Sequence, residues 1–216
     1  MAGRSSRVNG TNVRFDAEEA VQLLGARDPK LQALMERVGP FRMRLDVAAS
    51  PFEALCESII YQQITGRAAQ TIAGRFCERI GEGKFPPPQC VLDASDVILR
   101  EAGLSRGKVA ALRDLAAKSL DGTVPTMARL RRLPDDEIVE RLTVVRGIGR
   151  WTAEMFLMFR LGRPDVLPIH DYGVRKGFQR AFKTRELPEP EAVARRGERW
   201  KPYRTVASWY LWRALE

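Results

Sequence analysis

Residues 145–149 (VRGIG) have the composition of a turn that binds an anion through its backbone. Two glycines one residue apart permit a tight turn and leave N–H groups unshielded by side chains. A helix beginning just after the turn adds its own free N–H groups and the positive end of its dipole. Such a turn can hold a phosphate without a charged side chain. An ordinary helix–helix turn remains the alternative, because many turns contain a Gly-x-Gly pattern.

Asp171 is a carboxylate that could take part in chemistry; it follows the next helix and a loop over 164–170. At the start of a helix it can cap the first turn by accepting a backbone N–H. A fixed carboxylate can also stabilise positive charge that develops on a substrate. From position alone, capping is the commoner role. The three cysteines form no CxxC pair and His170 is the only histidine, so a zinc site is not predicted.

The elements that must position these residues are helices. Apolar residues recur at helical spacing, and no segment alternates with a period of two, so we predict an all-α fold of about ten helices. Two segments, 85–89 and 125–134, are predicted as connectors. The clearest predicted helices follow Ser50-Pro51 and the turn at 61–66, then span approximately 97–102, 108–120, 135–143, 151–161 and 171–182, with a last one from about 202.

Charge and composition favour a polyanionic partner. The 216 residues are 44% hydrophobic, and 36 Lys and Arg against 27 Asp and Glu give a net charge of +9. Every phosphate that such a surface neutralises releases a counterion, although solubility alone is a sufficient reason for basic charge. No apolar run approaches the ~18–20 residues that span a bilayer, and no secretory signal is visible. The cysteine usage fits a reducing cytoplasm, where the protein would act with the chromosome if the source is bacterial. We also expect a monomer without a membrane partner.

The predicted organisation is a basic, flexible tail over 1–14 and one domain over 15–216. Within the domain, we predict a helical subdomain over approximately 52–165 that contains the hairpin. A second subdomain combines 15–51 with 166–216.

Several ordered motifs give the chain a family resemblance. Residues 142–155 (LTVVRGIGRWTAEM) resemble the helix-hairpin-helix of the DNA glycosylase superfamily, and 166–175 (VLPIHDYGVR) resemble its aspartate segment. The turns at 62–63 and 104–108 and the segment 198–204 extend the likeness, which is narrowest to the 3-methyladenine DNA glycosylase II family. It implies two helical subdomains flanking a DNA-binding cleft. Only 51 residues precede Phe52, so we expect the compact form without the extra N-terminal β-domain.

The resemblance implies roles for the hairpin and the aspartate. Asp171 matches the family's catalytic aspartate, and no catalytic cofactor is implied. The phosphate-binding positions are Gly147, Ile148, Gly149 and Thr152. Such hairpins can also bind a structural monovalent cation, here through the carbonyls of Thr143, Val145 and Ile148.

Further positions bear on the base. Members that also nick the strand have a lysine where this chain has Trp151, so the resemblance implies a monofunctional enzyme. Trp151 and Trp212 match aromatic positions of the base pocket, where Met155 replaces a tyrosine; Trp200 and Trp209 are assigned to the core. Gln63 aligns with the residue that intercalates into the stack, and Gln62 either shares that role or caps the preceding helix.

The function that the resemblance implies is hydrolytic excision of flipped alkylated bases, 3-methyladenine and 7-methylguanine, from double-stranded DNA, leaving an abasic site. Two alternatives stay open: a non-enzymatic module that binds distorted duplex, and a glycosylase that also cleaves the strand through another lysine. Four cations are either phosphate contacts or solvated charges: Arg106, Lys108, Lys201 and Arg204.

Overall fold

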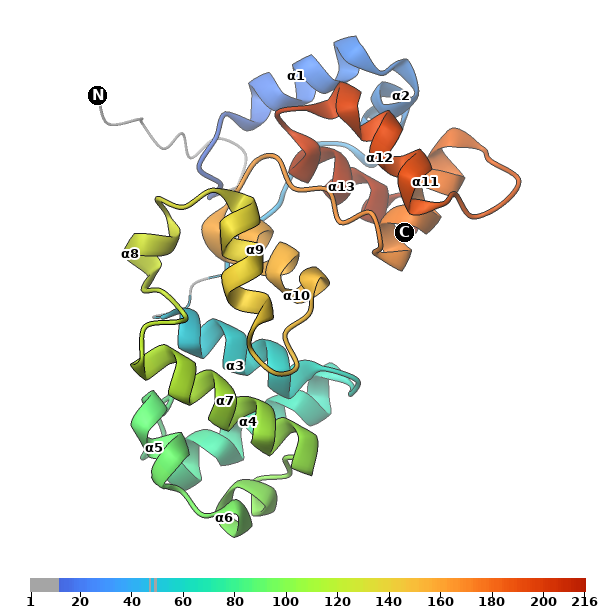
Figure 1. Cartoon of the computed structure of the whole chain (residues 1–216). Coiled ribbons are helices and arrows are strands. Elements are labelled where there is room, and N and C mark those ends of the chain that lie inside the picture. Colours follow the sequence, from blue (N-terminus) through green and yellow to red (C-terminus); the bar gives the residue numbers. More distant parts are fainter. Residues whose placement is uncertain (1–11, 47, 49) are drawn as a thin grey trace. The chain divides into compact units, whose positions relative to one another are not determined.

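The computed structural model describes residues 12–46, 48 and 50–216, which form helices joined by short loops (Figure 1). No strand occurs among these residues, so the all-α prediction is confirmed. The α-helices are α1 (Ala17–Arg27), α2 (Pro29–Val38), α3 (Pro51–Tyr61), α4 (Gly66–Ile80), α5 (Pro88–Asp93), α6 (Asp96–Glu101), α7 (Arg106–Leu120), α8 (Met127–Leu130), α9 (Asp135–Thr143), α10 (Arg150–Met155), α11 (Tyr172–Phe182), α12 (Pro190–Gly197) and α13 (Arg204–Arg213). A π-helix, η1 (Phe156–Leu161), continues α10, and a 3₁₀-helix, η2 (Glu198–Trp200), follows α12.

The sequence predicts most helix starts because their capping residues are visible in it. Ser50 accepts a hydrogen bond from the Glu53 N–H at 3.1 Å and precedes Pro51, as expected for α3. Thr65 and Ser105 cap α4 and α7 in the same way. The two predicted connectors were wrong in part: α5 begins within 85–89, and α8 lies within 125–134. Both helices are short, so neither shows an apolar repeat in the sequence.

The chain divides into two compact units. Unit 1 combines the N-terminal segment up to Asp46 with Leu157–Glu216, and unit 2 is Val47–Phe156. The sequence placed the second boundary near 165, whereas the chain re-enters unit 1 at Leu157. The reason is local packing: the Phe159 carbonyl accepts the Asp46 N–H at 2.9 Å, and the Phe159 ring stacks on Trp212.

The predicted tail, 1–14, is also corrected. Residues 1–11 lie outside the described part of the chain, but the last three belong to the folded unit. The Asn12 side chain exchanges two hydrogen bonds with the backbone of Leu45, and Val13 is buried. These contacts begin unit 1 earlier than composition suggests.

Each unit has its own core. In unit 2, α7 packs against α3 and α5, and the largest buried side chains include Phe76, Leu55, Ile59, Leu112 and Leu115. In unit 1, α11 packs on α13 and α1 on α2, around Trp200, Tyr210, Leu24 and Leu31. Trp200 and Trp209 are both buried, as predicted. None of the helices in the described part of the chain is long and apolar enough to cross a bilayer.

Candidate functional site

The hairpin between α9 and α10 in unit 2 is a hydrogen-bonded turn that needs its first glycine. The Ile148 N–H donates to the Val145 carbonyl at 3.0 Å, and Gly147 has a φ of 80°, the left-handed value of the third residue in a type II turn. Ile148 is buried and anchors the turn, as expected, while both glycines are exposed. Gly149 is the N-cap of α10 and offers no side-chain acceptor, so the sequence provides backbone N–H groups at this position.

A carboxylate that sequence reasoning missed fixes the hairpin from α7. Oδ2 of Asp114 accepts the Arg146 N–H at 2.7 Å, and Oδ1 is paired with Lys118. Burial alone would raise the pKa of Asp114, but the Arg146 N–H and the Lys118 ammonium lower it overall. Asp114 and Arg146 are 32 positions apart in the sequence, so no local pattern reveals the contact.

The α10 helix carries three predicted site residues in unit 2. Trp151 is 49% exposed, which is unusual for so large an aromatic side chain, and Met155 is half-buried one turn later on the same side. Thr152 is buried, so its backbone N–H rather than its side chain is the group suited to a phosphate.

The turn between α3 and α4 separates the two glutamines. Gln63 is exposed and has a φ of 57°, a left-handed conformation that costs a non-glycine residue about 1–2 kcal/mol. Gln62 is the C-cap residue of α3, but its side-chain amide does not bond to that helix: it donates to the Gly147 carbonyl of the hairpin at 2.9 Å. A share of Gln62 in intercalation stays a prediction.

Lys108 is also neither of the predicted alternatives, a phosphate contact or a solvated charge. Its ammonium donates to the carbonyls of Ile60 at 2.7 Å and Gln62 at 2.9 Å, where α3 ends. Burial lowers the pKa of this lysine. Because a cation at a helix C-terminus satisfies the last carbonyls, Lys108 stabilises the end of α3.

In unit 1, Asp171 is the N-cap of α11 and is held by two donors. The Val174 N–H and the Trp212 indole N–H both donate to Oδ1, at 2.7 and 2.8 Å. The capping interpretation is therefore correct for this oxygen, and the second donor fixes the plane of the carboxylate. Gly173 permits the arrangement, because a Cβ there would lie 2.8 Å from Trp212 and 3.0 Å from Asp171.

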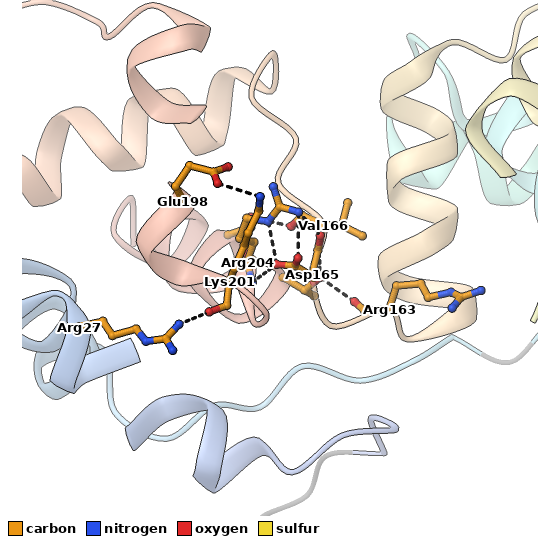
Figure 2. Close-up of polar contacts among 9 residues, drawn as sticks. Arg27, Arg163, Asp165, Val166, Glu198, Lys201 and Arg204 are labelled. Atoms are coloured by element: carbon orange, nitrogen blue, oxygen red, sulfur yellow. Dashed lines mark hydrogen bonds and ion pairs between the residues drawn. The ribbon is translucent and has the colours of Figure 1, made fainter. Parts of the chain in front are cut away.

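The loop that leads to Asp171 is tied to one side of α13. Arg204 donates to Asp165 through Nε at 2.7 Å and Nη2 at 2.9 Å, a bidentate ion pair (Figure 2). The Thr205 hydroxyl donates to the Arg163 carbonyl and accepts the Val166 N–H. With Trp212, these side chains recur along α13 at helical spacing, so one helix holds both ends of the loop.

Three charged side chains of the segment 198–204, those of Glu198, Lys201 and Arg204, have ion-pair partners within the protein. Arg204 is committed to Asp165, which corrects its assignment to phosphates or solvent. Lys201 is exposed and pairs with Glu198 at 2.8 Å, while its carbonyl accepts a hydrogen bond from Arg27 (Figure 2). Arg106 is exposed on the first turn of α7.

A groove, the possible metal ligands and the cysteine thiols are further candidates for a functional site. A groove of about 790 Å³ between α1 and α2 is lined by Phe15, Glu18, Met35, Glu36, Phe41 and Tyr210, among others, and contains no predicted site residue. Among the described residues, no group of three or more His, Cys, Asp or Glu side chains could hold a metal ion. Burial raises the pKa of Cys56, so this thiol is not an activated nucleophile.

An all-α chain with a helix-hairpin-helix and an aspartate that caps the helix after the next loop defines a class of DNA repair protein. The chain belongs to the HhH-GPD superfamily of base excision DNA repair proteins, whose family model matches residues 56–202.

Individual relatives agree with this assignment. The chain is 35% identical to DNA-3-methyladenine glycosylase 1 of Schizosaccharomyces pombe over 88% of this chain and 84% of that protein. It resembles the structure of the S. pombe 3-methyladenine DNA glycosylase in complex with abasic DNA, with a TM-score of 0.80 and 35% identity over 90% of this chain and 95% of that one. A DNA-3-methyladenine glycosidase structure from Bacillus halodurans gives a TM-score of 0.82 at 34% identity, covering 90% and 88% of the two chains.

Proposed function

We propose that this protein is a monofunctional DNA glycosylase that hydrolyses the N-glycosidic bond of alkylated bases in double-stranded DNA and leaves an abasic site. The observation that carries the proposal is Asp171, whose carboxylate is fixed by two N–H donors in a chain of the base excision repair superfamily. The relatives' names support 3-methyladenine as the substrate. We extend the proposal to 7-methylguanine, because it too is an N-alkylated purine that carries positive charge.

The mechanism needs only one carboxylate. As the bond between sugar and base lengthens, positive charge develops on the sugar, and a fixed anion stabilises it electrostatically. Glycoside hydrolysis ordinarily needs a second group to protonate the leaving group. An N-alkylated purine already carries positive charge and leaves without a general acid. Asp171 therefore suffices for cationic bases, with water as the nucleophile.

Trp151 supports the absence of strand cleavage. A lyase step requires an amine that attacks the sugar and forms a Schiff base. The first turn of α10 presents an indole where a lysine would be needed. The product is then an intact strand with an abasic site.

The aromatic residues are assigned to recognition of the base. An indole face attracts a cationic base through cation–π interaction, worth ~0.5–2 kcal/mol. Trp151 offers a half-exposed ring, and Trp212 offers a half-buried ring that stacks on Phe159. Met155 adds an apolar, adaptable surface in place of a further aromatic face.

The remaining assignments concern the duplex. Gln63 fills the gap that a flipped base leaves, and the backbone N–H groups of Gly147, Gly149 and Thr152 bind the phosphate. Ile148 contributes to this site by closing and anchoring the turn, because its own N–H is bonded to the Val145 carbonyl. The proposal also includes action on chromosomal DNA as a monomer, in the cytoplasm if the source is bacterial.

We also propose a structural monovalent cation beside that phosphate. The carbonyls of Thr143, Val145 and Ile148 belong to the hairpin, and among the described residues no donor to those of Thr143 and Ile148 is found. Carbonyl oxygens are suitable ligands for such an ion, and the bound cation would add a positive charge to the phosphate-binding hairpin.

The test is base release from duplexes that carry single defined lesions, by the wild type and by Asp171→Asn. Asparagine keeps a cap acceptor but loses the charge, so we expect release to fall by about 10³-fold or more. Strand breaks are expected only after alkali. An inactive wild type that still binds the duplex would instead identify a non-enzymatic DNA-binding module, and breaks without alkali would contradict the monofunctional assignment.

A further inference from the structure

The intercalating turn and the phosphate-binding hairpin are joined by a specific hydrogen bond. The Gln62 amide at the α3–α4 turn donates to the Gly147 carbonyl at 2.9 Å, across 85 positions of sequence. All of these residues lie in unit 2, whose fold places the two turns side by side. The bond therefore connects two segments that engage different parts of the DNA.

Each of the two turns is also anchored to α7. At the hairpin, Asp114 accepts the Arg146 N–H at 2.7 Å, one residue before Gly147. At the α3–α4 turn, the Lys108 ammonium donates to the carbonyls of Ile60 and Gln62. α7 thus provides a fixed base for both turns, and the Gln62–Gly147 bond closes the connection between them.

These bonds bear directly on Gln63. Its left-handed backbone is unfavourable for a residue with a side chain, so surrounding contacts must maintain it. The residue before it supplies those contacts, since both the carbonyl and the side-chain amide of Gln62 are bonded. Gln63 is accordingly presented from a backbone fixed relative to Gly147.

We propose that Gln62 is a positioning residue that couples insertion of Gln63 to the phosphate grip of the hairpin. The proposal rests on the proposed function, because it assigns Gln62 a role in base flipping. Flipping costs a few kcal/mol, which is recovered only when the gap is filled while the backbone is held. A preset distance between the two turns removes the entropy cost of ordering one after the other has bound.

The first experiment uses Gln62→Met, which keeps the length of the side chain and removes the amide. Gln70→Met is the matched control, an exposed glutamine on α4. Single-turnover release of 3-methyladenine should fall about tenfold in Gln62→Met, the loss expected from one oriented hydrogen bond. Affinity for undamaged duplex should stay within about twofold, because Asp114 still holds the hairpin, and Gln70→Met should match the wild type. Equal rates for Gln62→Met and Gln70→Met would overturn the proposal.

A double-mutant cycle separates coupling from general destabilisation. If Gln62 acts through Gln63, Gln62→Met should lower the rate by less than about twofold in a Gln63→Ala background. If the rate reduction in the double variant equals the product of the reductions in the two single variants, Gln62 acts independently of Gln63, and the proposal would be wrong.

A third measurement needs no base release, so failure of the proposed function can be distinguished from failure of this inference. A duplex with a tetrahydrofuran abasic analogue and 2-aminopurine opposite it reports insertion by its fluorescence change. We expect that change to be reduced in both Gln62→Met and Lys108→Met, the second variant serving if the first folds poorly. A wild-type fluorescence change in both variants would contradict the coupling even if the enzyme proved inactive on every lesion.

Discussion

At the residue scale, Asp171 combines a structural role with the proposed chemical one. Helix capping and the indole donor both use Oδ1, so the groups that stabilise α11 also orient the carboxylate. A carboxylate that stabilises a developing charge must be held before the reaction, since reorientation during the reaction would consume part of the stabilisation. Trp212 is therefore a positioning residue for Asp171 as well as an assigned base-binding residue.

Trp212→Phe isolates the positioning role. Phenylalanine keeps an aromatic ring against Phe159 but removes the N–H that donates to Asp171 at 2.8 Å. We expect kcat to fall about tenfold with KM within about twofold, because the lost bond orients the carboxylate in the transition state. Steady-state kinetics on an alkylated duplex measure both constants.

Trp209→Phe, in the buried core of the same helix, is the control. It should lower the melting temperature while leaving kcat unchanged at 25 °C. A raised KM with unchanged kcat in Trp212→Phe would show that the indole only binds the base.

Sequence reasoning reached some of these residues and not others, for a physical reason. Asp171 could be predicted because a carboxylate at a helix start, after the hairpin motif, is visible in the linear order. Gln62 and Arg204 could not be assigned, because their partners are Gly147 and Asp165, 85 and 39 positions away. A side chain's type shows what it can bond, and only the fold shows which partner is near.

At the element scale, the hairpin turn depends on a backbone conformation as much as on contacts. Gly147 has a φ of 80°, and a Cβ there would meet the Cβ of Ala111 at 3.3 Å. Gly147→Ala should destabilise the protein by about 1–2 kcal/mol and distort the turn that presents the N–H groups. We expect DNA affinity to fall at least several-fold, as measured by fluorescence anisotropy on undamaged duplex.

Gly122→Ala is the matched control for this prediction. Gly122 follows the end of α7 and has a similar φ of 83°, but a Cβ added there would meet no atom within 4 Å beyond its immediate neighbours in the chain. Urea unfolding should show a comparable loss of stability, while DNA affinity should be retained. Equal loss of affinity in both variants would mean that stability rather than hairpin geometry controls binding.

The start of a helix was predictable where a capping residue marks it. The place where one element or unit gives way to the next was not predictable where tertiary packing determines it. The predicted helix 151–161 is one apolar run in the sequence, yet it changes from α to π at Phe156. The boundary between the units falls at the same place. A π-helical turn shifts the direction of the side chains that follow, and the hydrophobic pattern of the sequence does not encode that shift.

At the scale of the whole molecule, unit 1 depends on one buried carboxylate that joins distant parts of the chain. Asp28 caps α2, forms a bidentate ion pair with Arg196 at 2.6 and 2.7 Å, and accepts the Trp200 indole N–H at 2.9 Å. It is fully buried, and its partners are 168 and 172 positions away. Because these bonds satisfy a buried charge, removal of either partner leaves the other uncompensated.

Asp28→Asn should therefore lower the free energy of unfolding by about 2–3 kcal/mol at pH 7, measured by urea titration. Burial alone would raise the pKa of Asp28, but the bonds from Arg196 and Trp200 lower it overall. A carboxyl whose pKa is lower in the folded state stabilises fully above its unfolded pKa of about 3.9 and loses this contribution as pH falls through the folded value. The difference in free energy of unfolding between wild type and Asp28→Asn should consequently narrow below about pH 4.

Asp96→Asn is the control, because it removes the exposed partner of Arg113; it should lower the free energy of unfolding by less than about 1 kcal/mol. A gap between wild type and Asp28→Asn that persisted undiminished into acid would show that packing, and not the charge, is what Asp28 contributes.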